Sequence, residues 1–194
     1  MAIPHFSLNC VPFPGLFNQL DASVGMVYGV GTDGKVYTLQ SEAWEQIPGD
    51  LSHVTIGPAG LWGVCQNSSI FKYWNNTWNE VKGELLKQID AGGPTFVVGV
   101  SASDNIFCLP AMATIPSNPV GFTLLDGALV YYSCGPMGCW GVNRYDSIFF
   151  RNDITRSSCK GTTWQQIPGS LVMIEVSTDG AVYGVNRQGY LYCR

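Results

Sequence analysis

The chain has 194 residues, of which 46% are hydrophobic and 12% are charged, and its formal net charge is −4. This length and composition suit one domain with a single buried core. Because the net charge is negative and the basic residues are scattered, neither nucleic acid nor an anionic membrane surface is an expected partner. No apolar run approaches the roughly 18 residues of a membrane-spanning helix, so membrane insertion is not expected.

The composition favours strands over helices. The chain contains 23 Gly and 11 Pro, and Val, Tyr, Phe and Trp are frequent. Glycine and proline favour tight turns, and β-branched and aromatic side chains fit a pleated sheet. The predicted fold class is therefore all-β.

Five segments along the chain share one pattern: an aromatic residue, an apolar residue three positions later, and then a glycine. The clearest copies are residues 44–49 (WEQIPG) and 164–169 (WQQIPG). Two more begin at Trp78 and Phe122, and in a degenerate first copy Cys10 takes the aromatic position. We expect these segments to be outer strands whose aromatic side chains are buried against a neighbouring sheet, at Trp44, Trp78, Phe122 and Trp164.

A Gly-Val pair follows each of these segments, and an aliphatic and an aromatic residue follow the valine six and seven positions later. A polar turn lies between, so each unit is predicted to contain a hairpin. Such units bury both sheet faces when they are arranged radially, which predicts a five-bladed β-propeller. The repeats are residues 10–43, 44–77, 78–121, 122–163 and 164–194 of one propeller domain.

The motif Trp-x-x-Ile-Pro-Gly-x-Leu, together with Leu61-Trp62-Gly63-Val64, resembles the tectonin repeat. Residues 54–60, 86–93 and 131–136 resemble the fish-egg lectins, which are related to horseshoe-crab tachylectin. The resemblance covers roughly residues 8 to 194. It implies a propeller that binds sugars and bacterial lipopolysaccharide. Family members usually carry a sixth blade, whereas this chain stops after Tyr190-Leu191-Tyr192.

The chain ends are expected to close the ring. The last repeat has no outer strand of its own, and residues 8–13 have the sequence of an outer strand without a sheet. We therefore predict that this N-terminal strand completes the last blade. A disulfide between Cys10 and Cys193 would join the two ends.

The remaining cysteines are also interpreted as disulfides, because seven cysteines without paired C-x-x-C spacing and only two histidines do not suit a structural zinc site. Cys134 and Cys139 flank a turn and are predicted to form a local disulfide. Cys108 and Cys159 are predicted to pair the two long insertions of adjacent blades, and Cys65 is left as the odd thiol. Disulfides and two sequons, at Asn67 and Asn75, indicate a secreted, extracellular protein that is glycosylated. No metal or other cofactor is expected.

Two sets of residues are candidate sugar contacts. Aromatic residues at one repeat position can stack on pyranose rings, although packing between blades is the commoner role of such residues: Trp62, Trp140 and Tyr183, with Tyr28 at the same position. Polar residues of the hairpin turns can bond sugar hydroxyls, although turn geometry alone also favours them: Asp33, Asn67, Asp104, Asn105, Asp146 and Gln188.

No nucleophile beside a base, acid pair or phosphate-binding loop is recognisable, so an enzyme is not expected. We interpret the chain as a lectin for N-acetylglucosamine- or galactose-type glycans or bacterial lipopolysaccharide, acting in innate defence or egg protection. Self-association would let it crosslink cells. The alternative is a non-catalytic protein-interaction propeller whose aromatics are entirely structural.

Overall fold

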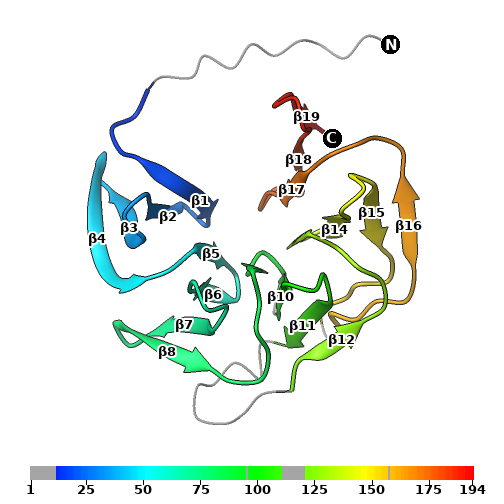
Figure 1. The fold of residues 1–194 in the computed structure, drawn as a ribbon, viewed down its shortest axis with the longest axis horizontal. Coiled ribbons are helices and arrows are strands. Elements are labelled where there is room, and N and C mark those ends of the chain that lie inside the picture. Colours follow the sequence, from blue (N-terminus) through cyan, green and yellow to red (C-terminus); the bar gives the residue numbers. More distant parts are fainter. Residues whose placement is uncertain (1–11, 95, 111–120, 157) are drawn as a thin grey trace.

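A computed structural model describes residues 12–94, 96–110, 121–156 and 158–194 (Figure 1). Within these residues the regular elements are nineteen β-strands, and they form five antiparallel sheets. The structure thus confirms the predicted all-β, five-bladed propeller. Among the described residues there is also no helix with the length and apolar character needed to cross a membrane.

The five sheets are the blades, and each begins with its innermost strand. Blades 1 to 4 have four strands and blade 5 has three. Blade 1 contains β1 (Phe17–Ser23), β2 (Met26–Gly31), β3 (Lys35–Gln40) and β4 (Ala43–Asp50). Blade 2 contains β5 (His53–Gly57), β6 (Gly60–Val64), β7 (Ile70–Trp74) and β8 (Thr77–Val81). Blade 3 contains β9 (Gln88–Asp90), β10 (Phe96–Val100), β11 (Ile106–Pro110) and β12 (Thr123–Leu125). Blade 4 contains β13 (Tyr131–Gly135), β14 (Gly138–Val142), β15 (Ile148–Arg151) and β16 (Trp164–Ile167), and blade 5 contains β17 (Met173–Val176), β18 (Val182–Val185) and β19 (Leu191–Cys193).

The Gly-Val pairs lie on the second strand of each blade, and the aliphatic-aromatic pairs lie on the third. In blade 4, for example, Gly141 pairs with Phe149 and Val142 with Ile148. The glycine is required because the leucine after the preceding outer strand covers it: a Cβ on Gly141 would lie 2.3 Å from Leu129 Cδ1. The blades are offset by one strand from the sequence repeats, since the tryptophan segment that opens each repeat becomes the outer strand of the preceding blade.

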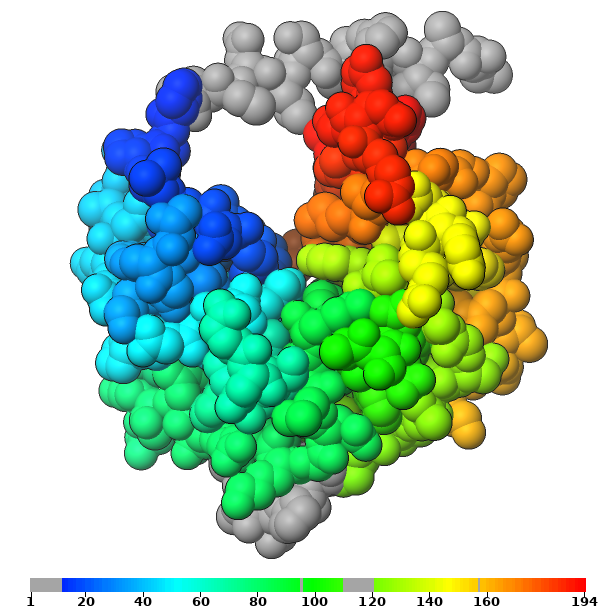
Figure 2. Space-filling model, viewed as in Figure 1, coloured from blue at the N-terminus to red at the C-terminus, as the bar shows by residue number. Residues whose placement is uncertain are grey.

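The blades are arranged around a common centre, and their innermost strands lie nearest to it (Figure 1); we call this central region the channel. Consecutive inner strands pack on each other in the order β1, β5, β9, β13, β17. The hydrophobic core is divided among the junctions, with one cluster between each pair of successive blades. Figure 2 shows an opening in the ring between blade 1, in blue, and blade 5, in red.

Hydrogen bonds join the inner strands around the channel. One polar residue on each of β1, β5, β9 and β13 accepts a backbone N–H from the next blade, which ties that blade to its successor. The acceptors and donors are Asp21 and Ile56 (2.7 Å), Thr55 and Ala91 (3.0 Å), Asp90 and Cys134 (3.0 Å), and Ser133 and Val176 (3.0 Å).

The outer-strand aromatics are half-buried rather than buried, which corrects the sequence-based expectation. Each aromatic ring packs on the preceding blade with one face. Its other face is open to solvent, because the outer strand lies at the surface of the propeller. The indole N–H of Trp164 donates to the carbonyl of Asp126 in blade 3 (2.8 Å), and that of Trp78 donates to Pro48 in blade 1 (2.5 Å). Gly127, with φ of +95°, lets Trp164 approach, because a Cβ there would lie 3.1 Å from the indole nitrogen.

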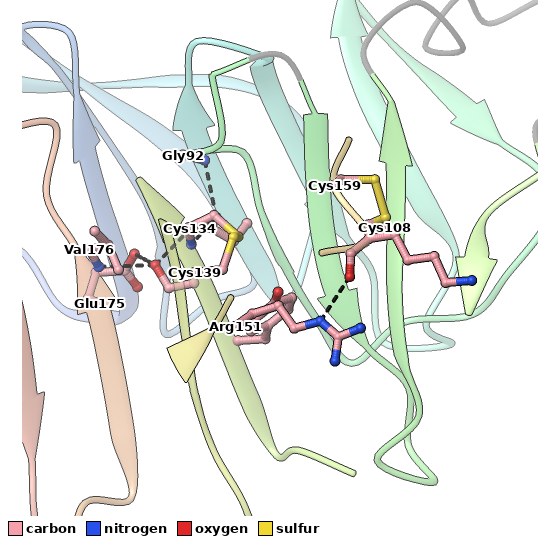
Figure 3. The surroundings of a disulfide bond; sticks show 12 residues. Gly92, Cys108, Cys134, Cys139, Arg151, Cys159, Glu175 and Val176 are labelled. Atoms are coloured by element: carbon pink, nitrogen blue, oxygen red, sulfur yellow. Dashed lines mark hydrogen bonds between the residues drawn. A yellow bond between two sulfur atoms is a disulfide. The ribbon is translucent and has the colours of Figure 1, made fainter. Parts of the chain in front are cut away.

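Two predicted disulfides are present (Figure 3). Cys134–Cys139 closes the β13–β14 hairpin, and Cys108–Cys159 connects β11 of blade 3 to the segment before β16 of blade 4. Cys65 is free, as expected. Cys193 is an exposed free thiol, and Cys10, like residues 8–11 of the predicted closing strand, lies outside the described residues. The Cys10–Cys193 bond and the strand closure therefore stay predictions.

Candidate functional site: clefts between neighbouring blades

Three clefts of one kind lie between successive blades. One wall is the loop that leaves the outer strand of the first blade, and the other is the hairpin turn and third strand of the next blade. Cleft A, of about 370 Å³, lies between blades 2 and 3, cleft B, of about 270 Å³, between blades 3 and 4, and cleft C, of about 340 Å³, between blades 4 and 5. These volumes are at or just below the lower end for small-molecule pockets.

The loop walls are held in place by the blade they leave. In each loop a leucine N–H donates to the carbonyl of a turn residue in the same blade: Leu86 to Ser68 (2.9 Å), Leu129 to Asp104 (3.0 Å) and Leu171 to Asp146 (3.0 Å). Those turn residues have positive φ, between 63° and 70°. The loop and the turn thus form one rigid rim.

The opposite wall carries an aromatic ring from one repeat position and a polar residue at the first position of the turn. The aromatics are Phe107, Phe149 and Tyr192 in clefts A, B and C, and the polar residues are Ser101, Asn143 and Asn186. An aromatic face beside amide or hydroxyl groups suits a pyranose, whose C–H face is apolar and whose rim carries hydroxyls.

The two asparagines use their oxygens for the turn and keep their amide groups toward the cleft. Asn143 Oδ1 accepts the N–H groups of Tyr145 and Ser147, each at 3.0 Å. Within the described residues, Asn143 Nδ2 has no acceptor, and Asn186 Nδ2 donates to the Tyr192 hydroxyl at 3.3 Å. Capping fixes each amide's orientation, so its N–H groups are preorganised donors.

Cleft C carries a cation as well. The Arg194 guanidinium lies 5.4 Å from the centre of the Trp140 ring, and both residues line this cleft. The Trp140 ring also packs on Phe150, with ring centres 5.0 Å apart. Cleft C therefore combines aromatic surface, an amide and a positive charge.

The predicted aromatic contacts separate into two groups. Trp140 and Tyr183 both line cleft C, and Tyr183 is 42% exposed. Trp62 is completely buried, and its indole N–H donates to the carbonyl of Ala59 at 2.9 Å. Trp62 therefore has no face open to a ligand.

The predicted turn residues occupy different positions and are mostly engaged within the protein. Asp33 accepts the N–H of Lys35 and the hydroxyl of Tyr37, which together lower its pKa. Asn67 Oδ1 accepts the N–H of Ser69 at 2.9 Å. Of the predicted turn residues, Asn105 lines cleft A. Gln188 is exposed on the turn beside cleft C.

Asp104 and Asp146 form ion pairs between blades. Asp104 is 4% exposed and contacts Lys87 Nζ at 2.7 Å and the Arg144 guanidinium at 2.6 Å. Burial alone would raise the pKa of Asp104, but the two cations lower it. Asp146 pairs with Arg187 of blade 5 at 2.6 Å. These carboxylates hold adjacent turns together.

Sequence reasoning missed the loop walls and the third-strand aromatics as site residues. Phe107, Phe149 and Tyr192 were recognised by their repeat position, but only as part of the hairpin. The sequence does contain a pattern that could have identified them. In each of these three repeats a polar residue lies six positions before the aromatic residue, at Ser101, Asn143 and Asn186. The predicted glycosylation sites, Asn67 and Asn75, are both exposed and stay predictions.

In the part of the chain that the structure describes, no three His, Cys, Asp or Glu side chains come together to hold a metal ion. The chemistry available in the clefts is stacking, hydrogen bonding and charge, from Arg194 in cleft C and Glu84 in cleft A. This combination suits small polar ligands.

The tectonin domain family matches residues 16–194 of this chain. The chain therefore belongs to the tectonin domain family. It is 43% identical over 190 residues to the fish-egg lectin of Cyprinus carpio, with 96% of this chain and 79% of that protein covered.

Solved structures with similar folds are distant in sequence. They include Prp20p from Saccharomyces cerevisiae (8% identity, TM-score 0.66), the WD40 propeller domain of Doa1 (7%, 0.65) and YCF48 from Cyanidioschyzon merolae (12%, 0.62). The match covers 91%, 91% and 96% of this chain and 57%, 62% and 70% of those chains. YCF48 bound to D1 peptide is similar as well, with 10% identity, a TM-score of 0.57 and coverage of 94% of this chain and 64% of that one. This chain thus spans less than two thirds of several of these proteins, and at these identities the likeness concerns the propeller fold alone.

Proposed function

We propose that this protein is a secreted, non-catalytic lectin that binds glycans in the clefts between its blades. The observation that carries the proposal is the recurrence of one cleft type, in which an aromatic ring lies beside a polar turn residue. The similarity to a fish-egg lectin supports the same function. Two disulfides fit an extracellular environment, because such bonds persist under oxidising conditions.

The expected ligands are N-acetylglucosamine- or galactose-type units of microbial or egg-coat glycans. Each cleft has room for about one sugar, so single-site affinity is expected to be low and several clefts would act together. Arg194 in cleft C is a suitable donor for the phosphate or carboxylate groups of lipopolysaccharide. Innate defence or egg protection is the role that these ligands suggest, and self-association would extend the avidity to cell crosslinking.

A protein-interaction propeller would need one asymmetric contact patch, whereas small clefts that recur at one repeat position favour a repeated small ligand. We therefore keep the lectin function as the single proposal.

The test uses the two capped asparagines. Asn143→Asp and Asn186→Asp keep the oxygen that caps each turn but remove the amide donors. The double variant is expected to fold like the wild type and to lose most binding to immobilised N-acetylglucosamine, galactose or lipopolysaccharide. Asn76→Asp makes the same chemical change on the exposed β7–β8 turn, away from the clefts, and is the control. Unchanged binding by the double variant, or no saturable binding of any glycan by the wild type, would reject the proposal.

A further inference from the structure

Two carboxyl groups from different blades flank one hydroxyl group at the channel. Ser133 Oγ, on β13 of blade 4, lies 3.2 Å from Asp90 Oδ2 of blade 3 and 2.6 Å from Glu175 Oε1 of blade 5. The same oxygen accepts the N–H of Val176 at 3.0 Å. Ser133 is completely buried and Asp90 is 5% exposed, so these contacts are shielded from bulk water. Three inner strands therefore meet at a single hydroxyl.

The hydrogens available at this hydroxyl can be counted. A serine hydroxyl has one hydrogen to donate and two lone pairs with which to accept. One lone pair of Ser133 takes the Val176 N–H, which leaves one hydrogen and one lone pair for the two carboxyl groups. Two carboxylates would both need the single hydrogen. One carboxylate and one carboxylic acid match what is left, because the acid donates to the hydroxyl and the hydroxyl donates to the carboxylate.

The lengths of the two contacts distinguish the acid from the carboxylate. The 2.6 Å contact of Ser133 with Glu175 has the length of a bond from a hydroxyl to a carboxylate, and the 3.2 Å contact with Asp90 is too long for one. Glu175 is also less buried than Asp90. Its second oxygen accepts the Tyr131 hydroxyl at 3.1 Å, so two hydroxyl donors reach this carboxylate.

The two oxygens of Asp90 have different partners, as the two oxygens of a carboxylic acid do. Oδ1 accepts the N–H groups of Cys134 at 3.0 Å and Gly92 at 3.2 Å. Oδ2 contacts the Ser133 hydroxyl. The first oxygen therefore acts as the carbonyl oxygen of the acid, and the second is free to carry the hydrogen that Ser133 accepts.

We propose that Asp90 is a neutral carboxylic acid in the folded protein at neutral pH, and that its proton is a pH-sensitive link between the inner strands of blades 3, 4 and 5. Asp90 donates to Ser133, and Ser133 donates to Glu175. Removal of the proton in alkaline solution leaves two negative charges beside one hydroxyl hydrogen, and one buried carboxylate oxygen loses its partner. The link therefore holds in acid and neutral solution and opens in alkaline solution.

The groups that face Asp90 from the other inner strands favour its neutral form. Burial, and then the charges of Glu175 on β17 and Asp21 on β1, raise the pKa of Asp90 well above 3.8. The N–H groups that it accepts lower this pKa, but they are weaker causes. Among the described residues no Lys or Arg side chain bonds this carboxyl. Burial also keeps the remaining titratable groups nearby neutral at pH 7, because it lowers the pKa of a histidine and raises that of two tyrosines: His53 on β5, and Tyr131 and Tyr132 on β13.

The equivalent hydroxyl on blade 2 needs no extra proton. Thr55 on β5 occupies the repeat position of Ser133, accepts the Ala91 N–H at 3.0 Å and bonds one carboxyl group, that of Asp21. Its hydrogen and its lone pairs are thus matched by one carboxylate and one N–H. Burial raises the pKa of Asp21 as well, but no second carboxyl shares its hydroxyl. Asp21 is therefore the ionised counterpart of Asp90 at the same repeat position.

Infrared spectroscopy of the full-length chain tests the proposal, because a carboxylic acid has a carbonyl band that a carboxylate lacks. At pH 8, where exposed carboxyl groups are ionised, the wild type is expected to show this band. Asp90→Asn is expected to lack it, whereas Asp21→Asn, the same change at the same repeat position, should keep it. A wild type without the band, its persistence in Asp90→Asn or its loss in Asp21→Asn would overturn the proposal.

The pH dependence of thermal unfolding gives a second readout. Asparagine at position 90 can donate to Ser133 and accept from Cys134 as the acid does, but it has no proton to release. The unfolded wild-type chain releases the Asp90 proton near pH 4, so the stability from this group is complete in acid and is lost as the pH rises. Asp90→Asn is therefore expected to unfold at a higher temperature than the wild type at pH 8, by a difference that shrinks toward pH 5.

A lower unfolding temperature of Asp90→Asn at pH 8, or a difference from the wild type that is the same at pH 5 and pH 8, would overturn the proposal. Neither readout involves glycan binding, so failure here leaves the lectin proposal untouched.

Discussion

The junctions on the two sides of blade 4 differ at the channel and at the outer rim. Between blades 3 and 4, Gln88 bonds both the N–H (3.2 Å) and the carbonyl (3.0 Å) of Tyr132, and Asp90 accepts Cys134 N–H. Between blades 4 and 5, Ser133 accepts Val176 N–H (3.0 Å) and donates to Glu175 (2.6 Å), and the Tyr131 hydroxyl also donates to Glu175 (3.1 Å). Both junctions have an ion pair between turns.

At the outer rim the contrast is larger. Arg151, 1% exposed, pairs with Asp126 (2.8 Å), donates to the Lys160 carbonyl (2.8 Å) and lies 4.7 Å from the Trp164 ring centre. The Cys108–Cys159 bond lies beside it (Figure 3). Cleft C lies at the same place between blades 4 and 5. Repeated positions thus do not give equal junctions: a disulfide, an ion pair and an aromatic ring hold the outer rim between blades 3 and 4, whereas a cleft lies at that place between blades 4 and 5.

Removing the covalent link at the stronger junction should have the largest effect. Cys108→Ala with Cys159→Ala opens a link of sequence separation 51 and is expected to lower the free energy of unfolding by about 4 kcal/mol, from the chain entropy of a loop of that size. The matched control is Cys134→Ala with Cys139→Ala, whose separation is 5 and whose expected loss is about 2 kcal/mol. Urea unfolding of both variants gives the comparison, and a larger loss in the control would contradict it.

Removing the aromatic filler should make the stronger junction resemble the weaker one. Trp164→Ala is expected to cost about 3 kcal/mol, at the lower end for a large aromatic because the ring is half-buried. Trp164→Phe keeps a ring but loses the bond to Asp126, with an expected cost of about 1 kcal/mol. A loss below about 1 kcal/mol for Trp164→Ala in urea unfolding would mean that the outer rim contributes little.

Much of the fold follows from local patterns. The Gly-Val pairs and the tryptophan segments predicted the strands and blade number, because each pattern depends on contacts that recur in every blade. The channel bonds were not predictable, because their acceptors at one shared position alternate between carboxylates and hydroxyls around the ring: Asp21, Thr55, Asp90 and Ser133.

The candidate site was harder to predict than the fold. Asp104 and Asn105 are neighbours in one turn, yet Asp104 is buried in ion pairs and Asn105 lines a cleft. The difference is due to Lys87 and Arg144, which are 17 and 40 residues away in sequence. No local pattern contains that information.

The channel carboxyls of the two junctions predict an unusual pH dependence. Burial, and then the charge of Asp21, raise the pKa of Glu175 from 4.5 to about 7, and Ser133 and Tyr131 donate hydrogen bonds to this carboxyl. The unfolded chain releases this proton near pH 4.5, whereas the folded protein holds it to about pH 7. Stability from this group is therefore complete at low pH and is lost as the pH rises from 4.5 to 7, by about 3 kcal/mol, since each pKa unit corresponds to roughly 1.4 kcal/mol.

Glu175→Gln should remove that loss. Its free energy of unfolding, measured between pH 4.5 and 8, is expected to change less with pH than that of the wild type. Glu45→Gln makes the same chemical change at an exposed position of β4 and should follow the wild-type profile. A profile for Glu175→Gln that runs parallel to the wild type would exclude Glu175 as the source.

The smallest expected effect is a gain, at the junction between blades 2 and 3. His53 occupies the position of Gln19 and Gln88, but both of its ring nitrogens are buried without a hydrogen-bond partner among the described residues. Burial lowers the pKa of His53 to about 4, so stability falls as the pH drops below 6.5, where the unfolded chain takes up a proton.

Gln19 and Gln88 each bond both backbone groups of one residue in the next blade, Val54 and Tyr132, and the equivalent residue beyond His53 is Ile89. His53→Gln should therefore form two new bonds to Ile89, stabilise the protein by about 1 kcal/mol at pH 7 and remove the acid-side loss. His53→Asn is the matched control, because its side chain is one methylene shorter and should not reach Ile89. Thermal unfolding at pH 5 and 7 measures both variants, and equal stabilities of the two would show that reach to the next blade is not what distinguishes the glutamine positions.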